Sequence, residues 1–274
     1  MRVLCSTGVF TRTSDPLNYA AILRYGPQFA ADGADGFEVI FYPGWYAAQE
    51  EVARALRASA LDFPAVHTEK SIGEAFGGER DKQEQGVSRF ERNCAFARQI
   101  GARLVVLHLW GLPHSDRRLE RNLRVLPRCL DIAERHELEL AIETIPCTVA
   151  DPLTNIRRVI ERDARACVAL DSEFLSLHGQ LDAVFEADWL WQTPLVRHVH
   201  LKDYDGSPVA GAARRYLHPG DGQINFARFL RRLRAAGFDG ALSLEARGID
   251  GENNVEAARI RASLRLIADL AREA

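Results

Sequence analysis

The sequence predicts an α/β protein, a single (β/α)8 barrel of the TIM type that forms one domain over residues 1–274. Three observations predict this architecture. Short apolar runs alternate with amphipathic stretches from one end of the chain to the other. No break in composition and no low-complexity linker divides the chain. A length of 274 residues with 47% apolar side chains suits one such barrel and supplies a large core.

The alternation supplies eight strands and eight helices in turn. The apolar runs expected as strands are 2–10, 36–41, 64–67, 103–108, 138–143, 166–171, 196–200 and 241–245. The stretches expected as helices are 16–31, 47–60, 80–100, 115–130, 153–161, 179–189, 225–237 and 254–271. Ser115 and Asn225 are suited to cap two helices, and Gly237 to end one. Helices between consecutive strands make the strands parallel. The glycine-rich loop at 68–78 is a candidate lid.

Charge and composition exclude several classes of partner. A net charge of −3 argues against a protein that binds the phosphate backbone of nucleic acids. No apolar run approaches the ~20 residues that span a bilayer, and the start MRVLCSTGVF does not resemble a signal peptide. Five cysteines without C-x-x-C spacing indicate reduced thiols, so we expect a cytoplasmic protein. The oligomeric state is left open, a homo-oligomer included.

Four ionisable side chains end the last four predicted strands. Side chains alternate between the two faces of a strand, and the bulky apolar set should face the helices. In the run 138–143 the opposite set ends in Glu143, and the same parity selects Asp171, His200 and Glu245. The carboxyl ends of parallel barrel strands meet at one mouth, where barrel enzymes place their chemistry. The sequence therefore predicts that these four side chains converge.

Crowded carboxylates would repel one another and shift each other's pKa values strongly. A divalent cation removes that repulsion. Three oxygen ligands and one imidazole favour Mn²⁺ or Mg²⁺, with Co²⁺ or Zn²⁺ as alternatives. Any one of these side chains alone would be read more simply as a surface charge just past a strand. Their shared parity favours one metal site formed by Glu143, Asp171, His200 and Glu245.

At these residues the chain resembles the xylose isomerase-like barrel superfamily, the sugar phosphate isomerase/epimerase group that also holds endonuclease IV. The resemblance covers essentially the whole chain. Its most specific parts are H-x-H-L-K-D at 198–203, G-D-G-x-I-N-F at 220–226 and S-L-E at 243–245. The resemblance implies the same four metal ligands. It also implies that Glu143 and Glu245 are the catalytic residues that transfer protons.

The chemistry fits these residues independently. A metal ion that chelates a substrate carbonyl and its neighbouring hydroxyl acidifies the C–H bond between them and stabilises the enediolate. One carboxylate could remove the proton and a second could return it elsewhere. We therefore expect a metal-dependent isomerase or epimerase of a small polyhydroxy ketone or aldehyde, such as a sugar, a sugar phosphate or an inosose. The sequence does not decide which glutamate is the base.

Departures from the family pattern narrow this expectation. Phe174 stands where the family often has a histidine, and Arg214-Arg215-Tyr216 replaces the Asp-x-His pair of the nuclease branch. Both changes argue for one metal rather than three and against an apurinic endonuclease. Gly206 replaces an arginine usual in ketose 3-epimerases. The H-L-K-D motif resembles that of inosose-type dehydratases and isomerases. A dehydratase (lyase) of a cyclic keto-polyol is therefore the alternative, with a non-catalytic sugar-binding barrel as a further one.

Six further side chains are expected near a substrate. They follow predicted strands or lie in the motifs above, and they are His67, His108, Trp110, His178, Lys202 and Arg247. His67 and His108 could contact substrate or a second metal, or form hydrogen bonds at the rim. Lys202 could bind a substrate oxygen or pair with Asp203. Arg247 could recognise an anionic group or be a solvated loop charge.

Overall fold

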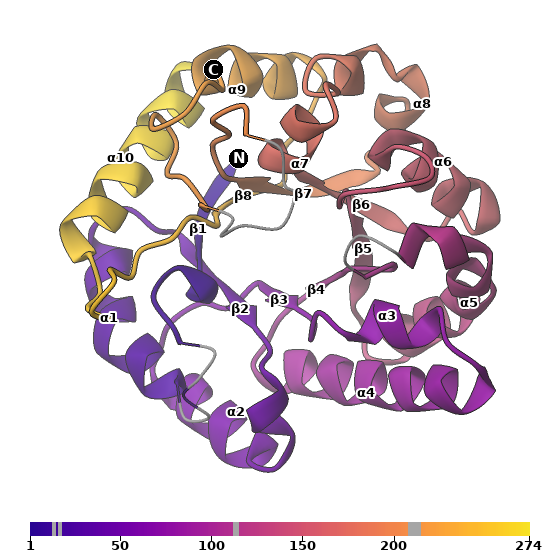
Figure 1. Cartoon of the computed structure of the whole chain (residues 1–274). Coiled ribbons are helices and arrows are strands. Elements are labelled where there is room, and N and C mark those ends of the chain that lie inside the picture. Colours follow the sequence, from indigo (N-terminus) through magenta and orange to yellow (C-terminus); the bar gives the residue numbers. More distant parts are fainter. Residues whose placement is uncertain (13–14, 16–17, 112–114, 208–214) are drawn as a thin grey trace.

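The computed structural model describes residues 1–12, 15, 18–111, 115–207 and 215–274. Eight strands close into one barrel in which each strand pairs with its sequence neighbours, and β1 pairs in parallel with β8. Figure 1 looks along this barrel and shows the helices as a ring around the strands. The predicted (β/α)8 barrel is thus confirmed. Within the described residues, no helix is both long and apolar enough to cross a membrane.

The elements follow the expected alternation. The strands are β1 (Arg2–Ser6), β2 (Gly36–Ile40), β3 (Ala65–His67), β4 (Leu104–Leu107), β5 (Glu139–Glu143), β6 (Cys167–Asp171), β7 (Val196–Leu201) and β8 (Ala241–Leu244). The α-helices are α1 (Tyr19–Ala31), α2 (Gln49–Ala58), α3 (Ile72–Phe76), α4 (Arg80–Gln99), α5 (Leu119–Arg135), α6 (Pro152–Arg162), α7 (Ser172–Leu177), α8 (Asp188–Trp191), α9 (Phe226–Ala235) and α10 (Ala257–Glu273).

The structure differs from the sequence prediction in three segments. The first strand ends at Ser6 rather than at residue 10, because a short 3-10 helix, η1 (Thr7–Val9), follows it. In place of one helix at 179–189 the chain forms the 3-10 helix η4 (Ala183–Glu186) and the short α8. α7 precedes them and begins directly after β6, because the Asp171 carboxylate accepts the N–H of Phe174 and caps it. The loop at 68–78 contains α3. The start of the predicted helix 16–31 and Arg214 lie outside the described residues.

The barrel wall separates two apolar cores. Large side chains such as Leu140, Ile142 and Val168 pack against the helices in the outer core. A small inner core fills the barrel below the mouth and consists of Leu4, Ala65, Leu104, Val106, Ala141 and Ala169. Residues of opposite parity on one strand therefore enter different cores, as in Leu140 and Ala141. The parity prediction is confirmed, and polar side chains occupy the inner face above this small core.

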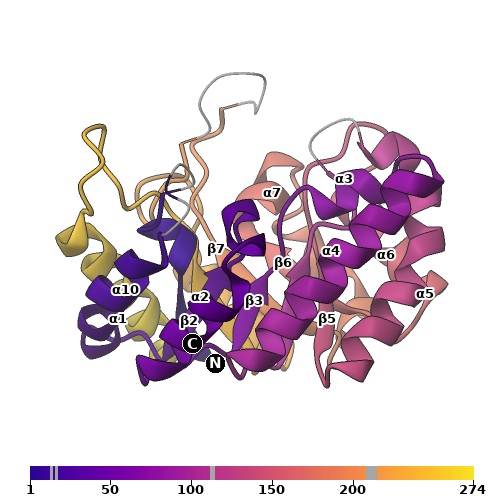
Figure 2. The ribbon, with the colours of Figure 1, turned by 90° about the horizontal axis from the view of Figure 1, so that it is seen from below.

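Strand register places the polar side chains of neighbouring strands at matching heights. Between β6 and β7 the register shifts after the Val168–Val196 pair, so that Ala169 lies opposite His198 and Asp171 opposite His200. His200 in turn lies opposite Ser243. Figure 2 shows the long connections that follow β7 and β8 projecting from one end of the barrel, while the two termini lie at the other. The carboxyl ends of the strands thus form one mouth.

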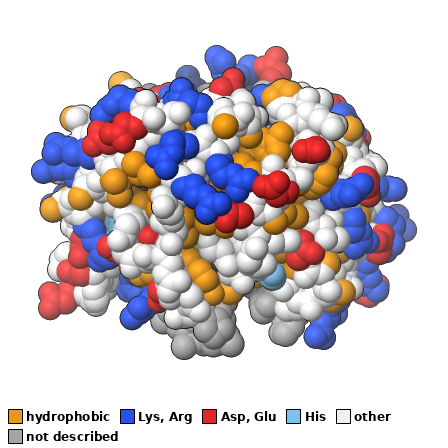
Figure 3. Space-filling view, turned by 90° about the horizontal axis from the view of Figure 1, so that it is seen from above, with side chains coloured by type: hydrophobic (Ala, Val, Ile, Leu, Met, Phe, Trp, Pro, Cys, Tyr) orange, Lys and Arg blue, Asp and Glu red, His pale blue; other side chains and the backbone are white. Residues whose placement is uncertain are grey.

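The surface carries both signs of charge. On the face in Figure 3, Lys and Arg side chains are interspersed with Asp and Glu and with apolar patches. Many exposed arginines pair with carboxylates of neighbouring helices, as Arg128 does with Glu84 and Arg232 with Glu186. This mixed face matches the small net charge of −3.

Two sequence motifs are joined by a single carboxylate. Asp203 of H-x-H-L-K-D accepts the backbone N–H groups of Gly220, Gly222 and Ile224 at 2.9, 2.9 and 3.0 Å. A Cβ atom on Gly222 would lie 2.5 Å from Asp203 Oδ1 and 2.6 Å from the carbonyl oxygen of Tyr204. The glycine is therefore required by the close approach of the two segments.

We expect Gly222→Ala to lower the free energy of unfolding by about 1–3 kcal/mol, because the added methyl group must push these backbone segments apart. Urea denaturation measures the change. Gly251→Ala is the matched control, since a Cβ atom there meets no atom within 4 Å. Equal stability of the two variants would contradict the proposed packing constraint.

Candidate active site

The four predicted ligand residues meet at the mouth of the barrel. One ligand atom from each of Glu143, Asp171, His200 and Glu245 lies within 4.8 Å of all the others, and all four residues are buried. His200 Nδ1 is 2.9 Å from Glu143 Oε1, 3.6 Å from Glu245 Oε2 and 4.0 Å from Asp171 Oδ2. β5, β6 and β7 supply three of these side chains, and Glu245 directly follows β8.

The spacing of these donors fits a divalent cation. Octahedral ligands about 2.1 Å from an ion lie about 3 Å apart when adjacent and about 4.2 Å apart when opposite, a range that includes the three distances from His200 Nδ1. The donor chemistry fits as well. His200 Nε2 faces the Glu38 carboxylate, and Nδ1 faces Glu143. Carboxylates only accept hydrogen bonds, so Nδ1 requires either a second ring proton or a cation between it and its neighbours.

Glu38 on β2 is a residue of the site that the sequence analysis missed. It is fully buried, and its Oε1 and Oε2 lie 2.9 and 3.1 Å from His200 Nε2. Ser243 Oγ donates to Glu38 Oε2 at 2.7 Å. With the Nε2 proton donated to Glu38, the Nδ1 atom of His200 is directed toward the other three ligand residues. A charged residue inside the apolar run 36–41 was the available signal.

The electrostatic surroundings of Glu143 and Glu245 favour the ionised forms of their carboxyl groups. Burial alone would raise the pKa of Glu143, but His108 and His200 hold that pKa well below its ordinary value. Burial would likewise raise the pKa of Glu245, and Lys202 with Lys70 lowers it. For His200 burial would lower the pKa, whereas the facing glutamates raise it well above its ordinary value.

The net formal charge of the site equals the charge that one divalent cation would neutralise. Four buried carboxylates face two ammonium groups, which leaves two negative charges when the histidines are neutral. The carboxylates are those of Glu38, Glu143, Asp171 and Glu245, and the ammonium groups those of Lys70 and Lys202. A divalent cation would neutralise this remainder without requiring a protonated histidine.

Two further donor groups adjoin the predicted one. His67 and His108 approach Glu143 Oε2 through their Nε2 atoms at 3.1 and 2.6 Å, and these three residues form a second group able to hold a metal. Burial lowers the pKa of His108 to about 4, which keeps its ring neutral. Glu38, His198 and His200 form the third group. The structure thus brings His67 and His108 beside Glu143 and the other candidate ligand residues.

Lys202 enters the site, while its neighbour Asp203 closes the loop described above. Lys202 Nζ forms an ion pair with Asp171 and lies 2.6 Å from Glu245 Oε2. The same ammonium group lies 4.8 Å from the ring centroid of Phe174, the residue at the expected histidine position. Lys202 thus pairs with two of the candidate ligand carboxylates, while Asp203 accepts backbone N–H groups of the loop.

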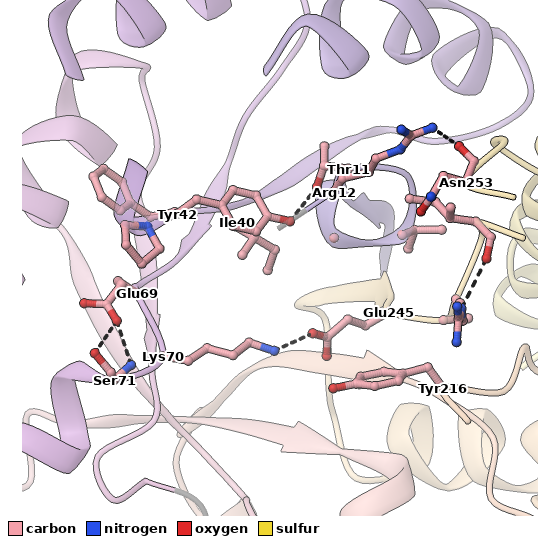
Figure 4. Close-up of a pocket in the computed structure, with 17 residues that line it drawn as sticks. Thr11, Arg12, Ile40, Tyr42, Glu69, Lys70, Ser71, Tyr216, Glu245 and Asn253 are labelled. Atoms are coloured by element: carbon pink, nitrogen blue, oxygen red, sulfur yellow. Dashed lines mark hydrogen bonds and ion pairs between the residues drawn. The ribbon is translucent and has the colours of Figure 1, made fainter. Parts of the chain in front are cut away.

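A cavity of about 750 Å³ opens above Glu245. Figure 4 shows Lys70 reaching toward Glu245 from one side, where its ammonium lies 3.4 Å from Glu245 Oε1, with Tyr216 beside them. Arg12 and Asn253 lie together on the side away from Lys70. Arg247, one of the predicted substrate contacts, also lines this cavity. Lys70, Tyr216 and Arg12 were not singled out from the sequence, because they lie on loops without a recognisable pattern.

Trp110 and His178 hold a loop and are not among the described residues that line this cavity. Trp110 Nε1 donates to the carbonyl oxygen of Pro146 at 3.4 Å, and His178 Nε2 accepts the N–H of Cys147 at 3.3 Å. Asp116 accepts the N–H groups of Thr148, Val149 and Ala150. All three side chains therefore fix the segment that follows Glu143.

Asp116 makes the stability of this loop dependent on pH. Burial would raise the pKa of Asp116, but its hydrogen bonds to backbone N–H groups keep that pKa below the ordinary value. The stabilisation that the ionised Asp116 carboxylate contributes to folding is thus fully present above the pKa of this group in the unfolded chain, near 4. It is lost as the pH falls through the lower pKa of the folded state. We expect Asp116→Asn to cost about 1–3 kcal/mol of unfolding free energy at pH 7 and less at pH 3.

Urea denaturation between pH 7 and pH 3 measures this difference. Asp239→Asn is the control, since Asp239 is exposed on the turn before β8, and it should change stability by less than about 0.5 kcal/mol at every pH. A pH-independent loss in Asp116→Asn would show that the ionised carboxylate is not what stabilises the loop.

Comparison with known protein families adds an independent observation. A family model described as "Xylose isomerase-like TIM barrel" matches residues 28–270, which is most of the chain. A probable L-ribulose-5-phosphate 3-epimerase, UlaE, of Mycoplasma pneumoniae is 27% identical over 124 residues. That match covers 44% of this chain and only 40% of the relative.

Solved structures share the fold over nearly the whole chain. A structure of L-ribulose 3-epimerase superposes with a TM-score of 0.77 and 16% identity, covering 99% of this chain and 95% of that one. The 3-keto-D-glucoside 4-epimerase YcjR of E. coli gives a TM-score of 0.71 and 21% identity, with coverage of 98% and 99%. The IOLI protein with a binding zinc atom gives 0.70 and 14%, with coverage of 100% and 99%.

Proposed function

This chain belongs to the xylose isomerase-like TIM barrel family, and on that premise we propose that it is a divalent-metal-dependent isomerase or epimerase of a small polyhydroxy ketone or aldehyde. The names of its relatives, which are epimerases of ribulose, ribulose phosphate and a keto-glucoside, support a carbohydrate substrate. The observation that carries the proposal is the convergence of Glu143, Asp171, His200 and Glu245 beneath an open cavity.

Glu143, Asp171, His200 and Glu245 would hold the metal. When bound, such an ion polarises the oxygen atoms of a substrate carbonyl and makes the neighbouring C–H bond more acidic. Mn²⁺ and Mg²⁺ suit the three carboxylates, and Co²⁺ or Zn²⁺ also accept the imidazole. The IOLI structure, whose description names zinc, is compatible with the last of these.

The different surroundings of the two glutamates support different roles in the proton transfer. Glu245 lines the cavity, so its carboxylate can take a proton directly from a substrate carbon. Glu143 is only 1% exposed and is held by His67, His108 and His200. We assign Glu245 as the base that contacts substrate first, and Glu143 as the second carboxylate whose proton is supplied through its histidine partners.

Exchange of substrate hydrogen with solvent tests this assignment. We expect the metal-loaded protein to incorporate deuterium from D₂O into keto-sugars, keto-sugar phosphates or inososes, followed by mass spectrometry or NMR. Glu143→Gln and Glu245→Gln should each lower the exchange rate by at least about 10²-fold, because each removes a general acid or base. Glu84→Gln on the outer face of α4 is the control.

The outcomes separate the candidate activities. Accumulation of a dehydrated product would assign the protein to the lyases. Binding of a sugar without exchange would indicate a non-catalytic barrel. Undiminished exchange in both glutamine variants would refute their catalytic roles. Metal analysis of the purified protein should find about one divalent ion per chain, whereas three would favour the nuclease branch of the family.

Glu38 provides a test of the metal site that does not depend on turnover. Glu38→Gln keeps the shape of the side chain but removes the charge that holds the His200 Nε2 proton. We expect the affinity for Mn²⁺ or Zn²⁺ to fall about 10- to 100-fold, measured by titration calorimetry. Nitrogen NMR of the His200 ring should show a loss of preference for the Nε2–H tautomer.

Ser243→Ala is the graded control, because it removes only the hydroxyl group that donates to Glu38. It should weaken metal binding less than Glu38→Gln does. An unchanged His200 tautomer together with unchanged metal affinity in Glu38→Gln would show that Glu38 does not orient the ligand.

A further inference from the structure

The cavity above Glu245 has two ends of different electrostatic character. At the Glu245 end the two carboxylates that line the cavity, those of Glu245 and Glu69, each face a cation. Glu245 meets Lys202 and Lys70, and Glu69 meets Arg89 at 2.7 Å. A neutral, hydroxyl-bearing part of a substrate suits this end. The other end presents the guanidinium groups of Arg12 and Arg247.

These two guanidinium groups retain most of their donors. Arg12 donates to the carbonyl oxygen of Asn253, and Arg247 Nε donates to that of Ile249 at 3.2 Å. Within the described parts of the chain neither arginine forms an ion pair. Each guanidinium has five N–H donors and uses one of them in this way. The remaining donors at this end of the cavity are therefore available to a ligand.

Hydrogen bonds fix the backbone at Arg247. Its backbone N–H donates to the carbonyl oxygen of Tyr216 at 2.8 Å. Its own carbonyl oxygen accepts from His218 Nε2 at 2.9 Å, and His218 Nδ1 lies 2.7 Å from Ser263 Oγ on α10. His218 is only 2% exposed. Buried partners on two segments thus fix the backbone from which this guanidinium extends.

Arg12 is tied to the same part of the molecule. The two carbonyl oxygens that the arginines contact belong to residues 249 and 253, which lie in one short turn closed by the bridge between Ile249 and Val255. Asn253 adopts a φ of 68°, a conformation that asparagine tolerates better than most residues. Asp250 in this turn accepts the N–H groups of Glu252 and Asn254, and the charge of Arg12 lies near enough to favour its ionised carboxylate without forming an ion pair with it. Both guanidinium groups therefore donate to carbonyl oxygens of the same turn.

We propose that Arg12 and Arg247 form an anion subsite for a phosphate or carboxylate group on the substrate, at the end of the cavity away from Lys70. Guanidinium groups bind the oxygen atoms of such anions through paired, charge-assisted hydrogen bonds. The substrate is then a phosphorylated polyhydroxy ketone or a keto-sugar acid, with its reacting carbons above Glu245 and its anionic group at the two arginines. This assignment rests on the proposed function, because it takes Glu245 as the reacting end.

Binding of simple anions tests the subsite separately from catalysis. Inorganic phosphate and acetate are titrated into the complete protein, with Mg²⁺ present, by calorimetry. We expect at least one of them to bind, and Arg12→Gln or Arg247→Gln to weaken that binding on the order of tenfold, because each removes charged hydrogen bonds. Arg231→Gln, an exposed arginine of α9 outside the cavity, should bind as the unchanged protein does.

The relative affinities distinguish the two sources of the anion. Tighter binding of phosphate assigns a phosphorylated substrate, and tighter binding of acetate assigns a sugar acid. Absence of binding, or equal binding in the Arg12, Arg247 and Arg231 variants, would overturn the subsite, since an anion bound to the metal ion would not depend on either arginine. Failure of the subsite with intact deuterium exchange would leave the proposed function standing. Anion binding that depends on the arginines, without exchange of any substrate, would support the subsite and contradict the proposed function.

Discussion

Negative charge concentrated inside a barrel is the constraint on which the rest of this structure depends. Glu38, Glu143, Asp171 and Glu245 are all buried at or near the carboxyl ends of the strands. Ionised carboxylates at this depth are tolerated only where cations and hydrogen-bond donors face them. Lys70, Lys202 and the histidine rings provide part of this compensation. A divalent ion would complete it, and the arrangement of the donors around His200 Nδ1 suits one.

The barrel makes this concentration of charge possible. Its lower interior is filled by small and aliphatic side chains such as Ala141 and Ala169. The layer above contains Glu38, His198 and Ser243, and the four candidate metal ligands lie at the mouth. Each layer supports the next, since Ser243 binds Glu38 and Glu38 orients His200. The barrel wall therefore fixes the relative positions of the four candidate ligand residues.

Several side chains in the connections after the strands hold the loops around the cavity in position. Asp203 and Gly222 bring the two long motifs together, and His218 holds the backbone of Arg247. Asp116, Trp110 and His178 fix the segment after Glu143. Several polar residues that would be natural candidates for substrate contact are thus used to position the loops that surround the cavity. Under the proposed function, substrate contact would fall to side chains that line the cavity, such as Lys70, Tyr216 and Arg247.

By itself the sequence determined the barrel and the four converging side chains, because strand parity and the alternation of apolar and amphipathic runs are local properties of the chain. Tertiary structure alone decided which polar groups meet. Glu38 lies 162 residues from its partner His200, and Ser243 lies 205 residues from Glu38. The register shift that aligns His200 with Asp171 also depends on pairing between strands. Contacts of this kind arise from closure of the barrel, which no local pattern records.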